Sequence, residues 1–169
     1  MIRRASWLLF ALAACGWPAT YDPHQPAQLV PDACVLSAVN GRVWAAAQMG
    51  AHWWDPLGGH MGETQGPSIP LRCLSEPEQD NVAAEWDGQA VWLSPDAWNL
   101  DPELQQGPQL EASIASITAH ELGHAMGMVH TPADLNSEMF PAWTSKPPDA
   151  TDAKQLCSLW GPSLAACAF

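Results

Sequence analysis

The hydrophobic positions of this chain recur with helical spacing in three segments and with the alternation of strands in two others. The first helical segment starts at Asp32, whose carboxylate suits a helix N-cap, and its apolar positions continue to Ala47. The pair Asn40-Gly41 lies inside this segment, and glycine is a poor helix former. The pattern therefore predicts a first helix over residues 32–47 that is weak in its middle.

A longer helix is predicted to begin at Pro108, because proline suits the first position of a helix. Its residues Leu110, Ile114 and Ile117 share one face, which we expect to lie against the core. A last helix is predicted over residues 149–160.

Two extended runs precede the long helix, at residues 81–86 and 89–94. The dipeptide Asp87-Gly88 lies between them and is typical of a tight hairpin turn. We therefore expect the two runs to be neighbouring strands of one sheet.

The N-terminus has the organisation of an export signal. Arg3 and Arg4 precede an apolar stretch, residues 5–14, that is too short to span a bilayer. The stretch ends in Leu-Ala-Ala-Cys at residues 12–15, which resembles a bacterial lipobox and predicts cleavage of residues 1–14 and acylation of Cys15. Gly16 after this cysteine, by resemblance to bacterial sorting rules, points to the outer membrane. The alternative is ordinary signal cleavage after Ala13, which would give a soluble secreted or periplasmic protein.

The remaining cysteines favour lipidation. If Cys15 is acylated, an even set of four is left for disulfides in an oxidising compartment: Cys34, Cys73, Cys157 and Cys167. Three pairings are possible, and short loop closure mildly favours Cys34 with Cys73 and Cys157 with Cys167. Residues 15–31 contain four prolines and are predicted to form an extended tether, which leaves residues 32–169 as one catalytic-sized domain.

The charge of the chain limits its partners. With 18 acidic and 6 basic residues the formal net charge is −12, which disfavours nucleic-acid binding. Calcium binding is possible, but no calcium-loop spacing assigns ligands. We expect a monomer that contacts the membrane only through its lipid.

The segment from His120 to His130 reads HExxHxxGxxH, and each fixed position has a separate chemical role. His120 and His124 are one helical turn apart and can bind one metal ion. Glu121 is placed to act as a general base on a metal-bound water. Gly127 can adopt a positive φ, so the helix can end there and bring His130 to the same ion. Three histidines leave one coordination position open, which is typical of a catalytic zinc.

This longer motif resembles the signature of the metzincin clan of zinc endopeptidases. Met139-Phe140-Pro141 follows it closely and is similar to the methionine-containing turn (Met-turn) of matrixin-type members, in which the methionine lies beneath the zinc. The resemblance implies an α+β zincin-type fold with a small twisted mixed sheet, an active-site helix, a Met-turn and a C-terminal helix. It also implies that Phe140 and Pro141 line an apolar pocket for the residue after the scissile bond. Thr131, after the third histidine, is closest to the serine typical of matrixins.

Two residues limit this resemblance. Glu138 stands before the methionine, where matrixins usually have a small or apolar residue. Cys73 is not a cysteine switch, because it lies inside the catalytic region and is better explained by a disulfide.

The motif and the resemblance together predict a zinc endopeptidase with a peptide or protein substrate. Three alternatives use the same residues: a zinc amidase of cell-wall peptides, a non-catalytic zinc-binding surface lipoprotein, and a zinc carrier. Outside the motif, His52 and His60 flank a glycine-rich loop but lack ligand spacing, so exposed loop histidines are the default interpretation and a second metal site the alternative.

Overall fold

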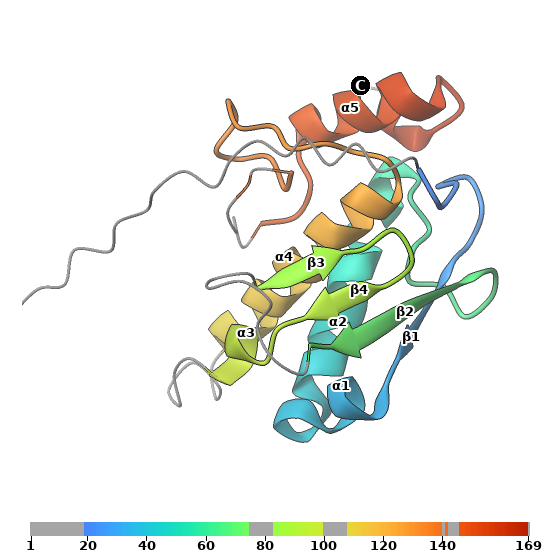
Figure 1. Cartoon of the computed structure of the whole chain (residues 1–169). Coiled ribbons are helices and arrows are strands. Elements are labelled where there is room, and N and C mark those ends of the chain that lie inside the picture. Colours follow the sequence, from blue (N-terminus) through green and yellow to red (C-terminus); the bar gives the residue numbers. More distant parts are fainter. Residues whose placement is uncertain (1–18, 75–82, 100–107, 140, 142–145, 169) are drawn as a thin grey trace, which may run out of the picture.

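The computed structural model describes residues 19–74, 83–99, 108–139, 141 and 146–168. It is an α+β structure with a small mixed sheet, as predicted, and helices packed on the sheet (Figure 1). In chain order the elements are β1 (Gln28–Pro31), α1 (Ala33–Ser37), η1 (Ala38–Gly41), α2 (Arg42–His52), η2 (Asp55–Leu57), β2 (Ser68–Cys73), β3 (Ala84–Trp86), β4 (Val91–Leu93), α3 (Asp96–Asn99), α4 (Pro108–Ala125), α5 (Ala150–Trp160) and η4 (Ala165–Cys167).

The sheet has the strand order β1-β2-β4-β3. β1, β2 and β4 are parallel to one another, and β3 pairs antiparallel with β4 at the end of the sheet. Side chains alternate between the faces of a strand, and Ile69 and Leu71 of β2 and Val91 of β4 are all fully buried. These residues form the sheet side of the core.

The predicted hairpin is confirmed, with its turn one residue later than expected. Asp87 pairs with Ala90 through a 3.3 Å backbone hydrogen bond, so Gly88 and Gln89 are the central residues. Gly88 has φ 90°, a left-handed conformation that glycine adopts without strain. Asp87 Oδ1 accepts hydrogen bonds of 2.7 Å from the backbone N–H groups of both Gln89 and Ala90.

The predicted first helix is divided into α1 and α2 by a break at the weak position. Val39, Asn40 and Gly41 have φ values of 50°, 58° and 82°, which no right-handed helix accommodates. Asp32 caps α1 as expected, because its side chain accepts from the Val35 N–H at 3.0 Å. A disulfide between Cys34 and Cys73 ties α1 to β2, with 6.1 Å between the Cα atoms.

The two long helices lie side by side across one face of the sheet (Figure 1). They approach closely at Gly50 of α2, where a Cβ would overlap the backbone of Ala115 in α4. Ile114 of α4 and Ala47 of α2 are fully buried at this interface. The core therefore lies between the sheet and the pair α2 and α4.

The folded region begins earlier than the sequence predicts, since part of the expected tether belongs to it. Gln28–Pro31 is strand β1, and the N–H groups of Thr20 and Tyr21 donate to the Ala125 carbonyl at the end of α4, at 3.0 and 3.2 Å. Prolines are compatible with this position because β1 is an edge strand. Residues 15–18 of the predicted tether and the signal residues 1–14 lie outside the described residues.

The last predicted helix is confirmed as α5. Asp149 and Asp152 form a capping box at its N-terminus, with each carboxylate accepting from the backbone of the other residue. Cys157 and Cys167 form a disulfide, so both pairs match the pairing that loop length favoured. Among the described residues, no helix has the length and apolar character needed to cross a membrane.

Candidate metal centre

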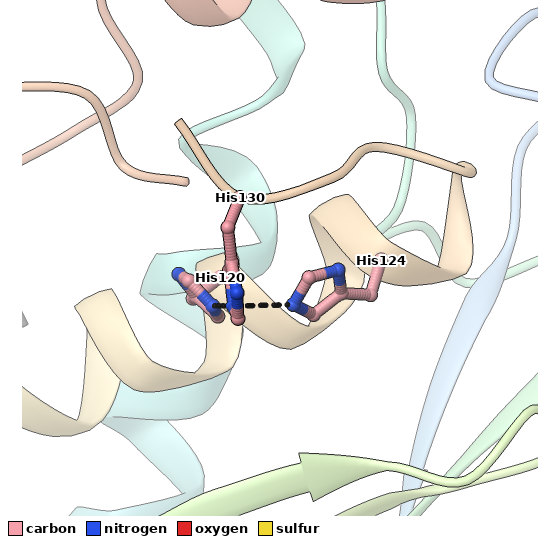
Figure 2. Close-up of side chains that lie close together, drawn as sticks. All are labelled: His120, His124 and His130. Atoms are coloured by element: carbon pink, nitrogen blue, oxygen red, sulfur yellow. Dashed lines mark hydrogen bonds between the residues drawn. The ribbon is translucent and has the colours of Figure 1, made fainter. Parts of the chain in front are cut away.

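The three histidines of the motif converge at the C-terminal half of α4. His120 and His124 project from the same face of this helix, one turn apart (Figure 2). The helix then ends in a glycine turn: Gly127 has φ 85°, its N–H donates to the His124 carbonyl at 2.9 Å, and the Met128 N–H donates to the Gly123 carbonyl at 3.0 Å. The chain turns back after Gly127, as the sequence predicts, and carries His130 to the other two rings.

The Nε2 atoms of these histidines lie at the separations expected of ligands to one ion. His130 Nε2 is 3.1 Å from His120 Nε2 and 3.2 Å from His124 Nε2 (Figure 2). Zn–N bonds of about 2.1 Å at tetrahedral angles would place two ligand nitrogens about 3.4 Å apart. One ligand nitrogen of each of the three rings lies within 4.8 Å of the others, so the three are close enough to share one metal ion.

Backbone carbonyls determine which ring nitrogens face this space. His120 Nδ1 lies 2.7 Å from the Glu138 carbonyl and His124 Nδ1 lies 2.9 Å from the Met128 carbonyl. A carbonyl oxygen only accepts hydrogen bonds, so each Nδ1 carries a proton and each Nε2 of the neutral ring presents a lone pair. His130 Nε2 can donate to one of these lone pairs and not to both. A cation between the three nitrogens would remove the repulsion between the lone pairs that still face one another.

The environment keeps the three rings neutral, which is the protonation state that binds metal. Burial, with the neighbouring His124 and His130, lowers the pKa of His120 to about 3 against the opposing effect of the Glu138 carbonyl. Burial and His130 lower the pKa of His124 to about 4, although its bond to the Met128 carbonyl acts in the other direction. Burial also lowers the pKa of His130. At neutral pH the cluster is thus a set of uncharged nitrogen donors.

Glu121 is a buried carboxyl group beside this cluster, with 8% of the residue exposed. Burial raises its pKa to about 8; the Trp86 N–H, which donates to the carboxylate, lowers the pKa, and the charge of Glu85 raises it. Without a nearby cation the group is therefore largely protonated at neutral pH. A cation in the histidine cluster would favour the carboxylate form.

Met139 is fully buried, with its sulfur packed against Gly123 of α4. A Cβ at position 123 would overlap the Met139 sulfur and lie 3.2 Å from Trp54 Cζ2, so only glycine fits there. Trp54 is itself fully buried and donates from Nε1 to the Ala119 carbonyl of α4 at 2.9 Å. The glycine at the second x of HExxH is thus explained by close packing, a role that the motif did not reveal.

A buried carboxylate organises the turn that contains Met139. Asp152 of α5 has no exposed surface, and it accepts from the Ser137 hydroxyl, from the Glu138 N–H at 2.8 Å and from the Met139 N–H at 3.2 Å. The same turn supplies the Glu138 carbonyl that orients His120. The sequence placed Asp152 only in the last predicted helix; its position three residues after the cap Asp149 indicates a capping box but not the contacts with the Met139 turn.

Two hydrogen bonds fix the segment that carries His130 to α5. The Val129 N–H donates to Gln155 Oε1 at 2.8 Å, and Gln155 Nε2 donates to the Val129 carbonyl at 3.0 Å. The Thr131 N–H donates to the Met139 carbonyl at 2.8 Å and joins this segment to the Met139 turn. His130 is consequently held on both sides although its ring is exposed.

The predicted pocket residues are only partly described. Phe140 lies outside the described residues, as does Cys15, and Pro141 is exposed. Glu138 is buried, with its Oε1 accepting from the Ser116 hydroxyl of α4 at 3.0 Å. The Glu138 carboxylate therefore lies against α4, whereas the backbone carbonyl of Glu138 faces His120.

Two other groups within the described residues bring potential metal ligands together. Asp32, Cys34 and Cys73 form one group, but both cysteines are in a disulfide and offer no thiolate. Asp55, His60 and Glu63 form the other.

Comparisons with known proteins add no relative: no family model matches the chain, and no curated protein sequence matches it. The function therefore has to be argued from the histidine cluster and its surroundings.

Proposed function

We propose that this protein is a zinc-dependent endopeptidase of the metzincin type, similar to matrixins. The observation that carries the proposal is the convergence of three neutral imidazole nitrogens next to a buried carboxyl group. The HExxHxxGxxH motif and the buried Met139, packed against Gly123 within that motif, support the same assignment.

The donor set fits zinc. Nitrogen from neutral imidazole is a preferred zinc ligand, and three protein ligands are typical of catalytic rather than structural zinc sites. His120, His124 and His130 would hold the ion, with the Glu138 and Met128 carbonyls fixing two of the rings. When bound, zinc supplies a Lewis acid and lowers the pKa of a coordinated water to roughly 7.

Glu121 is the proton carrier in this proposal. As a carboxylate it accepts the proton of the attacking water, and as a carboxylic acid it donates that proton to the nitrogen of the leaving amine. The backbone of Trp86 in β3 lies near this carboxyl group and favours its charged form. A carboxyl group whose pKa is raised by burial suits both steps, because it gains and loses a proton near neutral pH.

The edge of β3 is the surface on which an extended substrate would bind. The Asp87 N–H donates to the Ala90 carbonyl and the Ala83 carbonyl accepts from the Ser94 N–H, at the two ends of β4. In an antiparallel ladder the backbone groups of Ala84 and Trp86 therefore point away from β4. Trp86 also contacts Glu121, which places this edge beside the reacting group. A peptide added here as a strand would have its backbone fixed next to Glu121.

Export and anchoring belong to the proposal as well. Two disulfides within the described residues suit an oxidising compartment, as expected for a protein that leaves the cytosol. We infer an outer-membrane lipoprotein attached through Cys15, acting as a monomer on peptide or protein substrates. Its acidic surface gives no support to nucleic-acid binding.

The test is hydrolysis of casein by purified protein, with and without a chelator. Activity should disappear on chelation and return when zinc is added. Glu121→Ala should retain its zinc and lose at least ~100-fold in rate, the lower range for loss of a general base. Unchanged hydrolysis by the zinc-loaded variant would show that Glu121 is not the base.

The same preparations distinguish the alternatives. Cleavage of purified peptidoglycan without cleavage of casein would indicate the cell-wall amidase. Stable zinc binding without turnover on either substrate would indicate a non-catalytic zinc lipoprotein, and rapid exchange of the metal without turnover would indicate a carrier.

A further inference from the structure

A second group of potential ligands lies between the end of α2 and strand β2, apart from the histidine cluster. It comprises Asp55 in η2 and His60 and Glu63 in the glycine-rich loop that follows, with one ligand atom of each within 4.8 Å of the others. His60 Nδ1 is 3.8 Å from Glu63 Oε1, close to the roughly 3.4 Å between two ligands of a tetrahedral zinc.

A fourth residue of the same region orients Asp55. His52, the last residue of α2, has its Nδ1 2.9 Å from Asp55 Oδ2. The loop folds over this ring, since a Cβ at Gly62 would lie 2.9 Å from His52 Cε1. Carboxylates that ligate a metal are themselves held by hydrogen bonds from outer-sphere groups, and His52 can fill this role for Asp55.

The backbone of the loop is held in place by β1 and the segment before it. The Ala27 N–H donates to the His60 carbonyl at 2.8 Å, and the Glu63 N–H donates to the Ala27 carbonyl at 3.0 Å. Both loop ligands are therefore attached to the same buried residue, Ala27. Their side chains are presented from a fixed backbone, which reduces the entropy lost on binding an ion.

The charges and polar atoms of the group favour a cation. Asp55 lies against His52 and Glu63 against His60, and no lysine or arginine among the described residues forms an ion pair with either carboxylate. Asp55 Oδ1 has less than 1 Å² exposed and has no hydrogen-bond partner. A buried carboxylate oxygen without a partner costs free energy that a cation would recover.

We propose that Asp55, His60 and Glu63 form a second zinc site, with His52 as the outer-sphere partner of Asp55. Carboxylate oxygen and imidazole nitrogen together suit zinc, whereas calcium prefers oxygen ligands alone. The side chains are between 36% and 48% exposed, so an ion can enter from solvent. The ion would join the end of α2 to the loop and, through Ala27, to the N-terminal edge of the sheet.

The site can be tested without reference to catalysis. In a His124→Ala, His130→Ala background, the first cluster retains a single histidine, and the protein should still take up one zinc per chain from ZnCl₂, as measured by calorimetry and elemental analysis. Adding His60→Ala or Glu63→Gln should weaken this uptake at least ~10-fold, and His52→Ala should weaken it roughly 10- to 100-fold as for an outer-sphere partner. His24→Ala is the matched control, since His24 is also paired with an aspartate, Asp22, and should leave uptake unchanged.

Far-UV circular dichroism and free-thiol counting confirm that each variant is folded with both disulfides formed. Zinc should also raise the melting temperature of the background protein and not that of its Glu63→Gln derivative. Absence of zinc uptake by the background protein, equal uptake by all variants, or binding of calcium in preference to zinc would each overturn the assignment. None of these results depends on whether the first cluster is catalytic.

Discussion

Replacing Asp152 with asparagine should loosen the metal centre from a distance. Asp152 Oδ1 accepts from the Ser137 hydroxyl and the Met139 N–H, and Oδ2 accepts from the Glu138 and Asp149 N–H groups. In Asp152→Asn one oxygen becomes an NH₂ group. If it is Oδ2, the Glu138 and Asp149 N–H groups lose their acceptor; if it is Oδ1, the Ser137 hydroxyl loses its acceptor while the Met139 N–H keeps Ser137 Oγ at 3.0 Å. Each buried group left unsatisfied costs about 1–3 kcal/mol, so the free energy of unfolding should fall by about 1–6 kcal/mol.

The same substitution should also lower the zinc affinity. The disturbed backbone carries the Glu138 carbonyl that fixes the His120 ring, so zinc affinity should fall roughly 10- to 100-fold, as for other outer-sphere changes. Urea unfolding measures the first effect and competition with a zinc chelator the second.

Asp149→Ala provides the control, because Asp149 caps the same helix through its side chain but does not bond to the Met139 turn. It should lose about 1 kcal/mol of stability, typical of a missing N-cap, and retain its zinc affinity. If Asp152→Asn binds zinc as tightly as the Asp149→Ala control, then Asp152 does not support the metal centre.

Three further predictions concern packing, anchoring and specificity. Gly123→Ala should destabilise the protein by about 1–3 kcal/mol, measured by thermal unfolding, because its Cβ would overlap the Met139 sulfur; a neutral effect would contradict the described packing. Cys15→Ser should release the protein from membranes, whereas an unmodified Cys15 or a mature start at Ala14 in the intact mass would rule out lipidation. Peptide-library profiling should show preference for Leu, Met or Phe after the scissile bond, from the resemblance of Met139-Phe140-Pro141 to the matrixin pocket, and preference for charged residues there would contradict it.

The sequence predicted the elements that depend only on residues close to one another along the chain. The cap at Asp32, the glycine turn at Gly127 and the hairpin at Asp87-Gly88 each depend on a few consecutive residues with defined conformational preferences, and all are present in the structure. The break of the first helix at Asn40-Gly41 follows from the same kind of signal.

Elements that depend on distant partners were not predicted. Strand β1 was assigned to a tether because this stretch contains four prolines and little apolar periodicity, and only pairing with β2 makes it a strand. Strand β2 was not predicted either, since Pro70 interrupts its pattern.

The candidate site likewise contains residues that local sequence predicts and residues whose roles depend on distant contacts. The spacing of His120, His124 and His130 on a helix and turn predicts their convergence, and the structure brings them together. Asp152 and Trp54 could not be assigned, because their roles arise from contacts with the Met139 turn and with α4 that no local pattern records. The group around Asp55 was represented only by two loop histidines without ligand spacing, and the folded loop adds the two carboxylates.

If Cys15 is acylated as proposed, the attachment of Thr20 and Tyr21 to the end of α4 would limit how far the histidine cluster can lie from the lipid. Ala19 already contacts the Gly127 turn, so the chain from Cys15 to the folded region contains four residue steps and can reach about 14 Å at full extension. The histidine cluster would then operate close to the bilayer, on the side of the domain where α4 ends. Substrates would have to approach within this narrow layer, so proteins attached to the same membrane would encounter the site far more often than proteins free in solution.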